Sequence, residues 1–98
     1  MQTAPFSQLQ AFRAVARHRS FSAAARELGV SRSAVSHTVR QLEEQLGLTM
    51  LVRTTRSVSL TDAGRRLVES TGPLLGQLAT ALAEVSANPG ELVGRVRV

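Results

Sequence analysis

The sequence contains no cysteine, which excludes a disulfide framework and a thiolate metal site. It has no apolar run that approaches the ~20 residues a membrane-spanning helix needs. Residues 1–5 (MQTAP) show no charged segment followed by an apolar run, which argues against secretion. We therefore expect a soluble protein of the cytoplasm.

The residue groupings used in catalysis are also missing. We find no carboxylate pair suited to acid–base chemistry, no Ser/His/Asp arrangement, no glycine-rich phosphate loop and no metal-binding cluster. Only His18 is available to join His37 as a histidine ligand. With 98 residues, the chain has room for one small domain with a modest core. We expect no enzymatic activity, no metal site and no cofactor in this chain.

Lysine is absent, so all twelve basic residues are arginine, and their placement is uneven. Residues 1–60 contain eight arginines against three glutamates, a net charge of +5, whereas residues 61–98 contain four arginines against four acids. A basic module joined to a neutral segment suits a polyanionic partner. Arginine binds phosphate and guanine better than lysine does, because its planar guanidinium donates two hydrogen bonds side by side. Codon bias produces the same preference, so the absence of lysine carries little weight.

Three helices are predicted in the first half of the chain. The first covers about residues 5–18, where apolar side chains recur at helical spacing. The second is short, Ala23 to Leu28, with Ser22 as its N-cap and Gly29 as the positive-φ residue that ends it. Val30 follows as an apolar plug, and Ser31 caps a third helix over residues 31–46. This order is the helix-turn-helix pattern, although any corner between two helices needs similar residues.

The third helix has two different faces. Its apolar stripe consists of Val35, Val39, Leu42 and Leu46, at steps of four, three and four. Its other side carries short hydrogen-bonding groups beside positive charge: Arg32, Ser33, Ser36, His37 and Arg40. Such a face suits a helix that enters a DNA groove, with contacts through its N-terminal half. An ordinary solvated surface helix is the alternative.

The individual polar residues also have competing roles. His37 is suited to a base or phosphate contact but is equally at home in solvent, and Arg40 can bind phosphate or pair with Glu44 one turn on. Ser22 can cap its helix as well as touch phosphate. The acidic C-terminal part of the third helix, Glu43 and Glu44, should not contact phosphates.

Two short strands are expected after the third helix, over residues 48–53 and 57–60, with Thr54-Thr55-Arg56 at the hairpin tip. Arg53 and Arg56 place positive charge where a wing meets the DNA backbone or minor groove. The alternative is a solvated hairpin whose charges blunt its edge. We favour the wing because the hairpin directly follows the candidate recognition helix.

A long helix is predicted from the N-cap Thr61 to about Val85. Its apolar stripe is too wide for one small domain to cover, so we interpret it as a helix–helix dimer seam, with packing on its own domain as the alternative. The seam residues are Leu67, Thr71, Leu74, Leu75, Leu78, Leu82 and Val85. Gly72-Pro73 interrupts the stripe, and we expect a bent continuous helix or two separate helices.

Asn88-Pro89-Gly90 breaks the helix, and Glu91 to Val98 reads as an extended tail. Because a strand there has no partner in the chain, we infer the start of a second domain. The expected organisation is a winged domain at residues 1–60, a linker dimerisation helix at 61–87, and a hinge at 88–98 that leads into a missing domain.

These features together resemble the N-terminal region of LysR-type transcriptional regulators. The matching pieces are Phe12 with Ala16; Ser20-Phe21-Ser22-Ala23-Ala24-Ala25 with Leu28; Ser31 followed by Ala34-Val35-Ser36; Leu42-Glu43 with Leu46-Gly47; Arg53 with Arg56; and Leu60-Thr61 with Ala63-Gly64. They cover residues 6–64. The chain departs from the family pattern at Arg19, where glycine is common, at Arg32, where glutamine is common, at Ser33, a frequent proline, and at Leu51, usually phenylalanine.

The resemblance implies a mainly α fold: a winged helix-turn-helix of three helices and a two-stranded β wing, followed by a long linker and dimerisation helix. It implies a bacterial activator or repressor that binds double-stranded DNA at an imperfect inverted repeat, as a homodimer or a tetramer built from dimers. A small-molecule co-inducer would bind the missing effector domain. The alternative is a non-specific, nucleoid-type nucleic-acid-binding module.

The expected DNA contacts place helix 31–46 in the major groove and wing 53–57 at the backbone or minor groove. The residues we expect to touch DNA are Ser22, Arg32, Ser33, Ser36, His37, Arg40, Arg53, Thr55 and Arg56.

Overall fold

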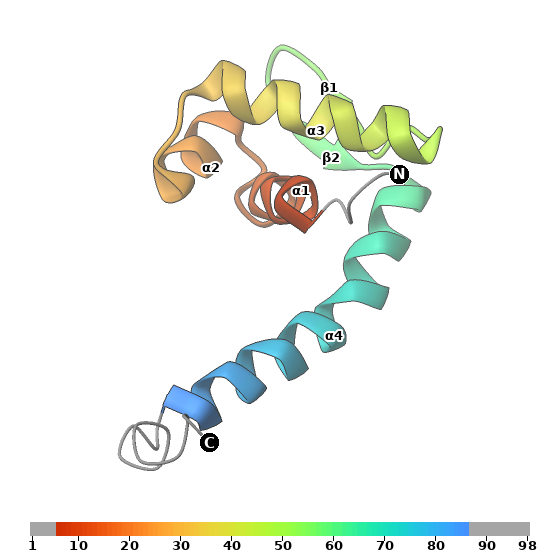
Figure 1. The fold of residues 1–98 in the computed structure, drawn as a ribbon. Coiled ribbons are helices and arrows are strands. Elements are labelled where there is room, and N and C mark those ends of the chain that lie inside the picture. The colour runs from red at the N-terminus through yellow and green to blue at the C-terminus, as the bar shows by residue number, and fades with distance from the viewer. Residues whose placement is uncertain (1–5, 87–98) are drawn as a thin grey trace. The chain divides into compact units, whose positions relative to one another are not determined.

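The computed structural model describes residues 6–86, which form four helices and one small sheet (Figure 1). In chain order the elements are α1 (Phe6–His18), α2 (Phe21–Leu28), α3 (Arg32–Leu46), β1 (Leu51–Arg53), β2 (Val58–Leu60) and α4 (Asp62–Ser86). The predicted fold class is therefore confirmed. The chain divides into two compact units between Val68 and Glu69. The predicted tail at 88–98 lies outside the described residues.

The core of the first unit lies among the three helices of the helix-turn-helix region, where α1 packs against both α2 and α3. Its largest buried side chains are Phe12, Val15, Val35, Val39, Leu42 and Met50. Alanines at 11, 14, 24 and 25 fill the contacts between the helices, and small side chains allow their backbones to approach closely. Burying each large apolar side chain stabilises the fold by about 2 kcal/mol, so this core anchors α3 firmly.

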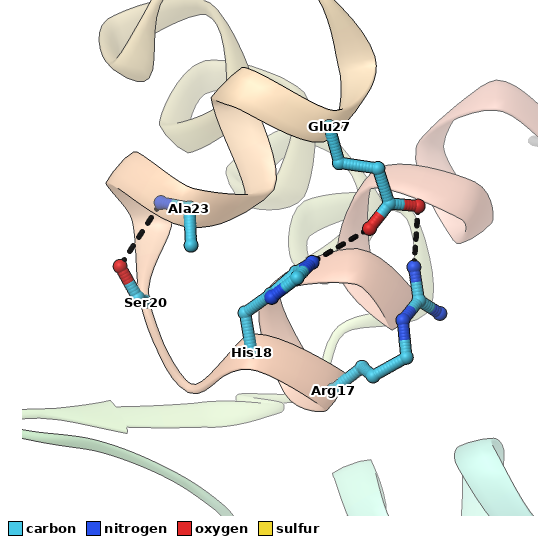
Figure 2. Close-up of polar contacts among 5 residues, drawn as sticks. All are labelled: Arg17, His18, Ser20, Ala23 and Glu27. Atoms are coloured by element: carbon cyan, nitrogen blue, oxygen red, sulfur yellow. Dashed lines mark hydrogen bonds and ion pairs between the residues drawn. The ribbon is translucent and has the colours of Figure 1, made fainter.

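Ser20, and not Ser22, is the N-cap of α2. The Ser20 side chain accepts a hydrogen bond of 3.0 Å from the Ala23 backbone N–H (Figure 2), and α2 begins at Phe21. The prediction for Ser22 was wrong because it overlooked Phe21, whose side chain is 4% exposed as part of the core. The helix starts two residues earlier than predicted, and Ser22 lies exposed within its first turn.

The ends of α2 and α3 follow the expected glycine rule. Gly29 and Gly47 have φ of 72° and 69°, and each donates its N–H back to the helix it ends. Ser31 caps α3 by accepting a hydrogen bond of 3.1 Å from the Ala34 N–H. Local hydrogen bonds of this kind satisfy the donors and acceptors left over at helix ends.

Two apolar predictions for α3 and its preceding turn were wrong. Leu46, assigned to the buried stripe, is 44% exposed, and Val30, expected as an apolar plug, is 49% exposed. The core reaches only Val35, Val39 and Leu42 on α3. Leu46 falls in the last turn of α3, past its last buried residue Leu42, and Val30 lies in the turn between α2 and α3.

The sheet is an antiparallel hairpin in which Leu51 faces Leu60, Val52 faces Ser59 and Arg53 faces Val58. Both strands are shorter than predicted. At the start of β1, the backbone N–H groups of Met50 and Leu51 donate to Oε2 of Glu43, at 2.8 and 3.2 Å. A side chain of α3 thus takes the place of a β partner at this end of the hairpin.

Thr61 caps α4 as predicted, accepting a hydrogen bond of 3.0 Å from the Gly64 N–H. Gly64 is buried, and a Cβ at this position would lie 2.2 Å from the Met50 carbonyl oxygen, so only glycine fits. Within the first unit, Ala63, Leu67 and Val68 pack against the core. The first turns of the helix therefore pack on their own domain.

Helix α4 is continuous through Gly72-Pro73, so the alternative of two separate helices was wrong. Proline lacks an N–H, which removes one hydrogen bond to the preceding turn. Beyond Glu69, most of the described residues of the helix are exposed, with Leu74 and Leu82 each at 61%. None of the helices in residues 6–86 has the length and apolarity to cross a membrane.

Candidate nucleic-acid interface

A polar groove of about 290 Å³ lies beside the N-terminal half of α3. The side chains that line it come from α2, α3 and β1, and are Phe21, Arg32, Ser33, Ser36, Arg40 and Arg53. Five of these six are residues predicted to contact DNA. The fold therefore brings the base of the wing next to the start of the candidate recognition helix, although the two are 17 residues apart in sequence.

Arg53 is held in this groove by two contacts. Its guanidinium carbon lies 4.3 Å from the centre of the Phe21 ring, and its Nη1 donates a hydrogen bond of 3.1 Å to Ser36 Oγ. A cation over an aromatic face is attracted by the negative face of the ring. From the sequence, Phe21 was assigned to the family motif and not to the DNA-binding site. The sequence feature that could have indicated its role is an aromatic residue at the start of a helix rich in alanine.

The groove is strongly positive. Three guanidinium groups line it, and none of the described lining residues is acidic. Each guanidinium presents five N–H donors in a planar fork, a geometry that matches phosphate oxygens. The hydroxyls of Ser33 and Ser36 add short donors at the same place. Chemically, the groove is built to bind an anion that carries several oxygens.

The other predicted DNA-contacting residues of the helices lie outside the groove lining. His37 is exposed on α3, and Ser22 is exposed on α2. Ser33, within the lining, has its Oγ 3.4 Å from Ser31 Oγ. Exposure alone does not show whether His37 or Ser22 touches DNA, so both contacts stay predictions.

The wing tip is a hydrogen-bonded turn organised by Thr54. The Thr54 N–H donates to the Ser57 carbonyl at 2.8 Å, and the Thr54 hydroxyl accepts from the N–H groups of Arg56 and Ser57 at 3.1 and 2.9 Å. Threonine and serine hydroxyls form such turns with the backbone two or three residues on. Thr54 was not singled out from the sequence, yet it is the residue that leaves Thr55 and Arg56 exposed at the tip.

An ion-pair cluster joins the C-terminal end of α1 to α2 (Figure 2), and none of its residues lines the groove. Glu27 accepts from Arg17 Nη2 at 2.5 Å and contacts His18 Nε2 at 2.6 Å. The hydrogen bond from Arg17, followed by that from His18, lowers the pKa of the Glu27 carboxyl below its ordinary value. Across residues 6–86, no three His, Asp or Glu side chains gather in a way that could hold a metal ion.

The predicted seam residues of α4 fall into two groups. Leu67 packs on the core of the first unit, and Thr71 and Leu75 are half-buried. The remaining four are exposed in the single chain: Leu74, Leu78, Leu82 and Val85. An exposed apolar row on one helix suits a partner helix, but the assignment of these residues to a dimer stays a prediction.

A helix-turn-helix followed by a β-hairpin, with an arginine-lined groove at the start of its second helix, is a winged-helix DNA-binding domain. Residues 6–65 match the family model described as the bacterial regulatory helix-turn-helix protein, lysR family. The chain therefore belongs to the LysR family, and it is a DNA-binding domain of that type.

Curated relatives agree with this assignment. The chain is 47% identical over 92 residues to the HTH-type transcriptional regulator PtxR of Pseudomonas aeruginosa, which covers 94% of this chain and 30% of PtxR. It is 42% identical over 98 residues to the HTH-type transcriptional regulator PgrR of Escherichia coli K12, covering 100% of this chain and 33% of PgrR. The chain thus spans about a third of the length of these relatives.

Solved structures show the same fold. The chain matches the DNA-binding domain of BenM in complex with catB site 1 DNA with a TM-score of 0.79 and 26% identity, covering 89% of this chain and 96% of that one. It matches the CbnR DNA-binding domain–DNA complex with a TM-score of 0.74 and 32% identity, covering 89% and 97%. A Corynebacterium glutamicum OxyR mutant gives a TM-score of 0.79 at 28% identity, covering 89% and 28%.

Proposed function

We propose that this chain is the DNA-reading part of a cytoplasmic bacterial transcriptional regulator, an activator or a repressor without enzymatic activity. It binds double-stranded DNA sequence-specifically at an imperfect inverted repeat, as a homodimer formed through α4 and as a tetramer if two dimers associate. The observation that carries the proposal is the groove that joins Arg32, Arg40 and Arg53 at the N-terminal half of α3.

In this proposal α3 enters the major groove by its N-terminal turns. Arg32, Ser33 and His37 lie toward the bases, since the start of a recognition helix meets base edges in helix-turn-helix proteins. Ser22 and Arg40 reach phosphates on the groove walls. The wing residues Arg53, Thr55 and Arg56 lie at the backbone or minor groove.

We propose a small-molecule co-inducer for the whole protein and not for this chain. The chain spans about a third of its relatives, so a further domain that binds a small molecule would follow residue 98. In this chain itself we propose no cofactor and no metal.

Selection of bound sequences from a random DNA pool tests the proposal. We expect a two-fold repeat with half-sites about one helical turn (~34 Å) apart, and two chains per site. Protection of DNA without sequence preference would instead support a non-specific, nucleoid-type module. A single unpaired half-site with one bound chain would contradict the dimer.

The salt dependence of binding to the selected site tests the arginine groove. Each neutralised phosphate adds about 0.9 to the slope of log K against log salt, so Arg40, Arg53 and Arg56 on each of two chains predict a steep fall in affinity. Arg40→Ala should lower the slope by about 1.8 in the dimer. Arg17→Ala is the matched control, because the Arg17 guanidinium is paired with Glu27 and does not line the groove.

A further inference from the structure

We propose that Phe21 and Ser36 are positioning residues that hold Arg53 ready for one DNA backbone phosphate. This inference rests on the proposed function and adds the device by which the wing arginine is presented. Neither residue's role in holding Arg53 follows from the family match.

The three side chains come together from separate parts of the fold. Phe21 starts α2, Ser36 lies in the second turn of α3, and Arg53 ends β1, so each comes from a different element. The Arg53 guanidinium carbon is 4.3 Å from the Phe21 ring centre, and Nη1 is 3.1 Å from Ser36 Oγ. One contact restrains the plane of the guanidinium and the other restrains its rotation, so the fork has a defined direction.

Phe21 and Ser36 are both held rigidly by the core. Phe21 is 4% exposed and belongs to the hydrophobic core, and Ser36 lies one residue after the buried Val35 on the same helix. Their positions are therefore set by core packing and not by the wing. A short two-stranded hairpin is weakly stable by itself, so these contacts supply the orientation that the strand cannot.

The Arg53 guanidinium keeps N–H donors that Ser36 does not use. Ser36 takes one of the five guanidinium N–H donors, which leaves donors for a phosphate. Arg32 and Arg40 line the same groove, and no described lining residue is acidic to compete with the anion. Arg53 thus presents its free donors to a positive groove that suits a phosphate group.

Holding the side chain in advance affects affinity. An unrestrained arginine loses rotamer freedom when it binds, at a cost equivalent to roughly two- to tenfold in affinity per side chain. If Phe21 and Ser36 remove that cost before binding, their loss should weaken binding by about fivefold without changing how many phosphates are neutralised.

A double-mutant cycle on the 98-residue chain tests this with the selected inverted repeat. Phe21→Leu should raise the Kd about fivefold and leave the salt slope unchanged. In an Arg53→Ala background the same change should have little effect. Phe12→Leu is the matched control: Phe12 is fully buried in the same core but does not line the groove, so its effect should be the same with and without Arg53. Additive effects for Phe21 and Arg53, or equal coupling for Phe12, would overturn the proposal.

A measurement on the free protein separates this inference from the proposed function. NMR relaxation of the Arg53 Nε–H group should show an ordered side chain in the wild type and a mobile one in Phe21→Leu and Ser36→Ala. A mobile Arg53 in the wild type would overturn the positioning role whatever the DNA results. An ordered Arg53 in a protein that selects no DNA sequence would uphold the positioning and overturn the proposed function.

Discussion

At the scale of single residues, Arg19 shows how local strain is accepted in the turn between α1 and α2. Its φ of 53° lies in the left-handed region, and it is the one described non-glycine residue with positive φ. Its N–H still closes the helix through a 2.7 Å hydrogen bond to the Val15 carbonyl. The backbone at Arg19 thus adopts the left-handed conformation that glycine adopts most readily.

Arg19→Gly should therefore stabilise the protein. Removing the Cβ relieves a left-handed strain of 1–2 kcal/mol, and the greater freedom of glycine in the unfolded chain offsets part of it, so we expect a gain of about 0.5–1 kcal/mol. Urea unfolding followed by circular dichroism measures it. Arg19→Ala keeps the strain and is the control; an equal gain for alanine would show that the side chain, and not the backbone, was responsible.

Glu27 provides a pH-dependent contribution at the same corner. Its pKa is lowered in the folded state, first by the Arg17 hydrogen bond and then by His18. The folded pKa lies below the unfolded value, so the stabilisation is present above the ordinary carboxyl pKa and is lost as the pH falls through the folded value.

Glu27→Gln should accordingly lower the Tm slightly at neutral pH, because the pair is exposed and such pairs contribute little. The difference from the wild type should shrink as the pH falls below the ordinary carboxyl range. Thermal unfolding at a series of pH values checks this, with Glu44→Gln, an exposed acid on α3, as the comparison. A difference that persists at low pH would contradict the assignment.

At the scale of elements, Glu43 connects α3 to the wing hairpin. Its Oε2 accepts from the backbone N–H groups of Met50 and Leu51, both part-buried contacts. At the other end of α3, Ser36 accepts from Arg53. The hairpin is therefore tied to one helix at two levels, and this explains how three-residue strands keep a fixed register.

Replacing Glu43 by alanine leaves two backbone donors without a partner, at a cost of about 2 kcal/mol. Glu43→Gln keeps an amide oxygen that can accept, so it should cost less than half as much. Chemical denaturation gives both values, and amide hydrogen exchange at Met50 and Leu51 should accelerate in the alanine variant only. Wild-type stability in Glu43→Ala would show that water replaces the carboxylate.

At the scale of the whole molecule, α4 carries an apolar row that a single chain leaves exposed. Leu78 is 43% exposed, and its neighbours along the row are more so. An exposed side chain contributes little to the folding of its own chain, so a substitution there should report on association alone.

Leu78→Asp should weaken the proposed homodimer without lowering the stability of the winged domain. Losing a central interface residue costs about 2 kcal/mol, or roughly 30-fold in the dimer Kd. Analytical ultracentrifugation measures the change. Thr80→Asp is the control, since at 100° per residue Thr80 lies opposite Leu78 on the helix. Equal dissociation in both variants, or in neither, would contradict a seam at Leu78.

Much of the fold and part of the site were predictable, because they depend on short-range rules. Hydrogen bonds at helix ends join residues three to five apart, so Ser31, Gly29, Gly47 and Thr61 could be assigned from spacing. The charge of the first 60 residues and the apolar periodicity of α3 likewise depend on the order of residues alone. These features were enough to predict the winged fold and five of the six residues in the groove.

Packing settled the rest. Phe21 with Arg53, Glu43 with the β1 backbone, and the exposure of Val30 and Leu46 all depend on which elements meet in space and how far the core extends. Such contacts join residues that no local rule pairs, and their free energy comes from a shared core that forms only when all three helices assemble. The sequence therefore determines the helices, their ends and the positive charge, whereas packing of the core brings the arginines together in one groove.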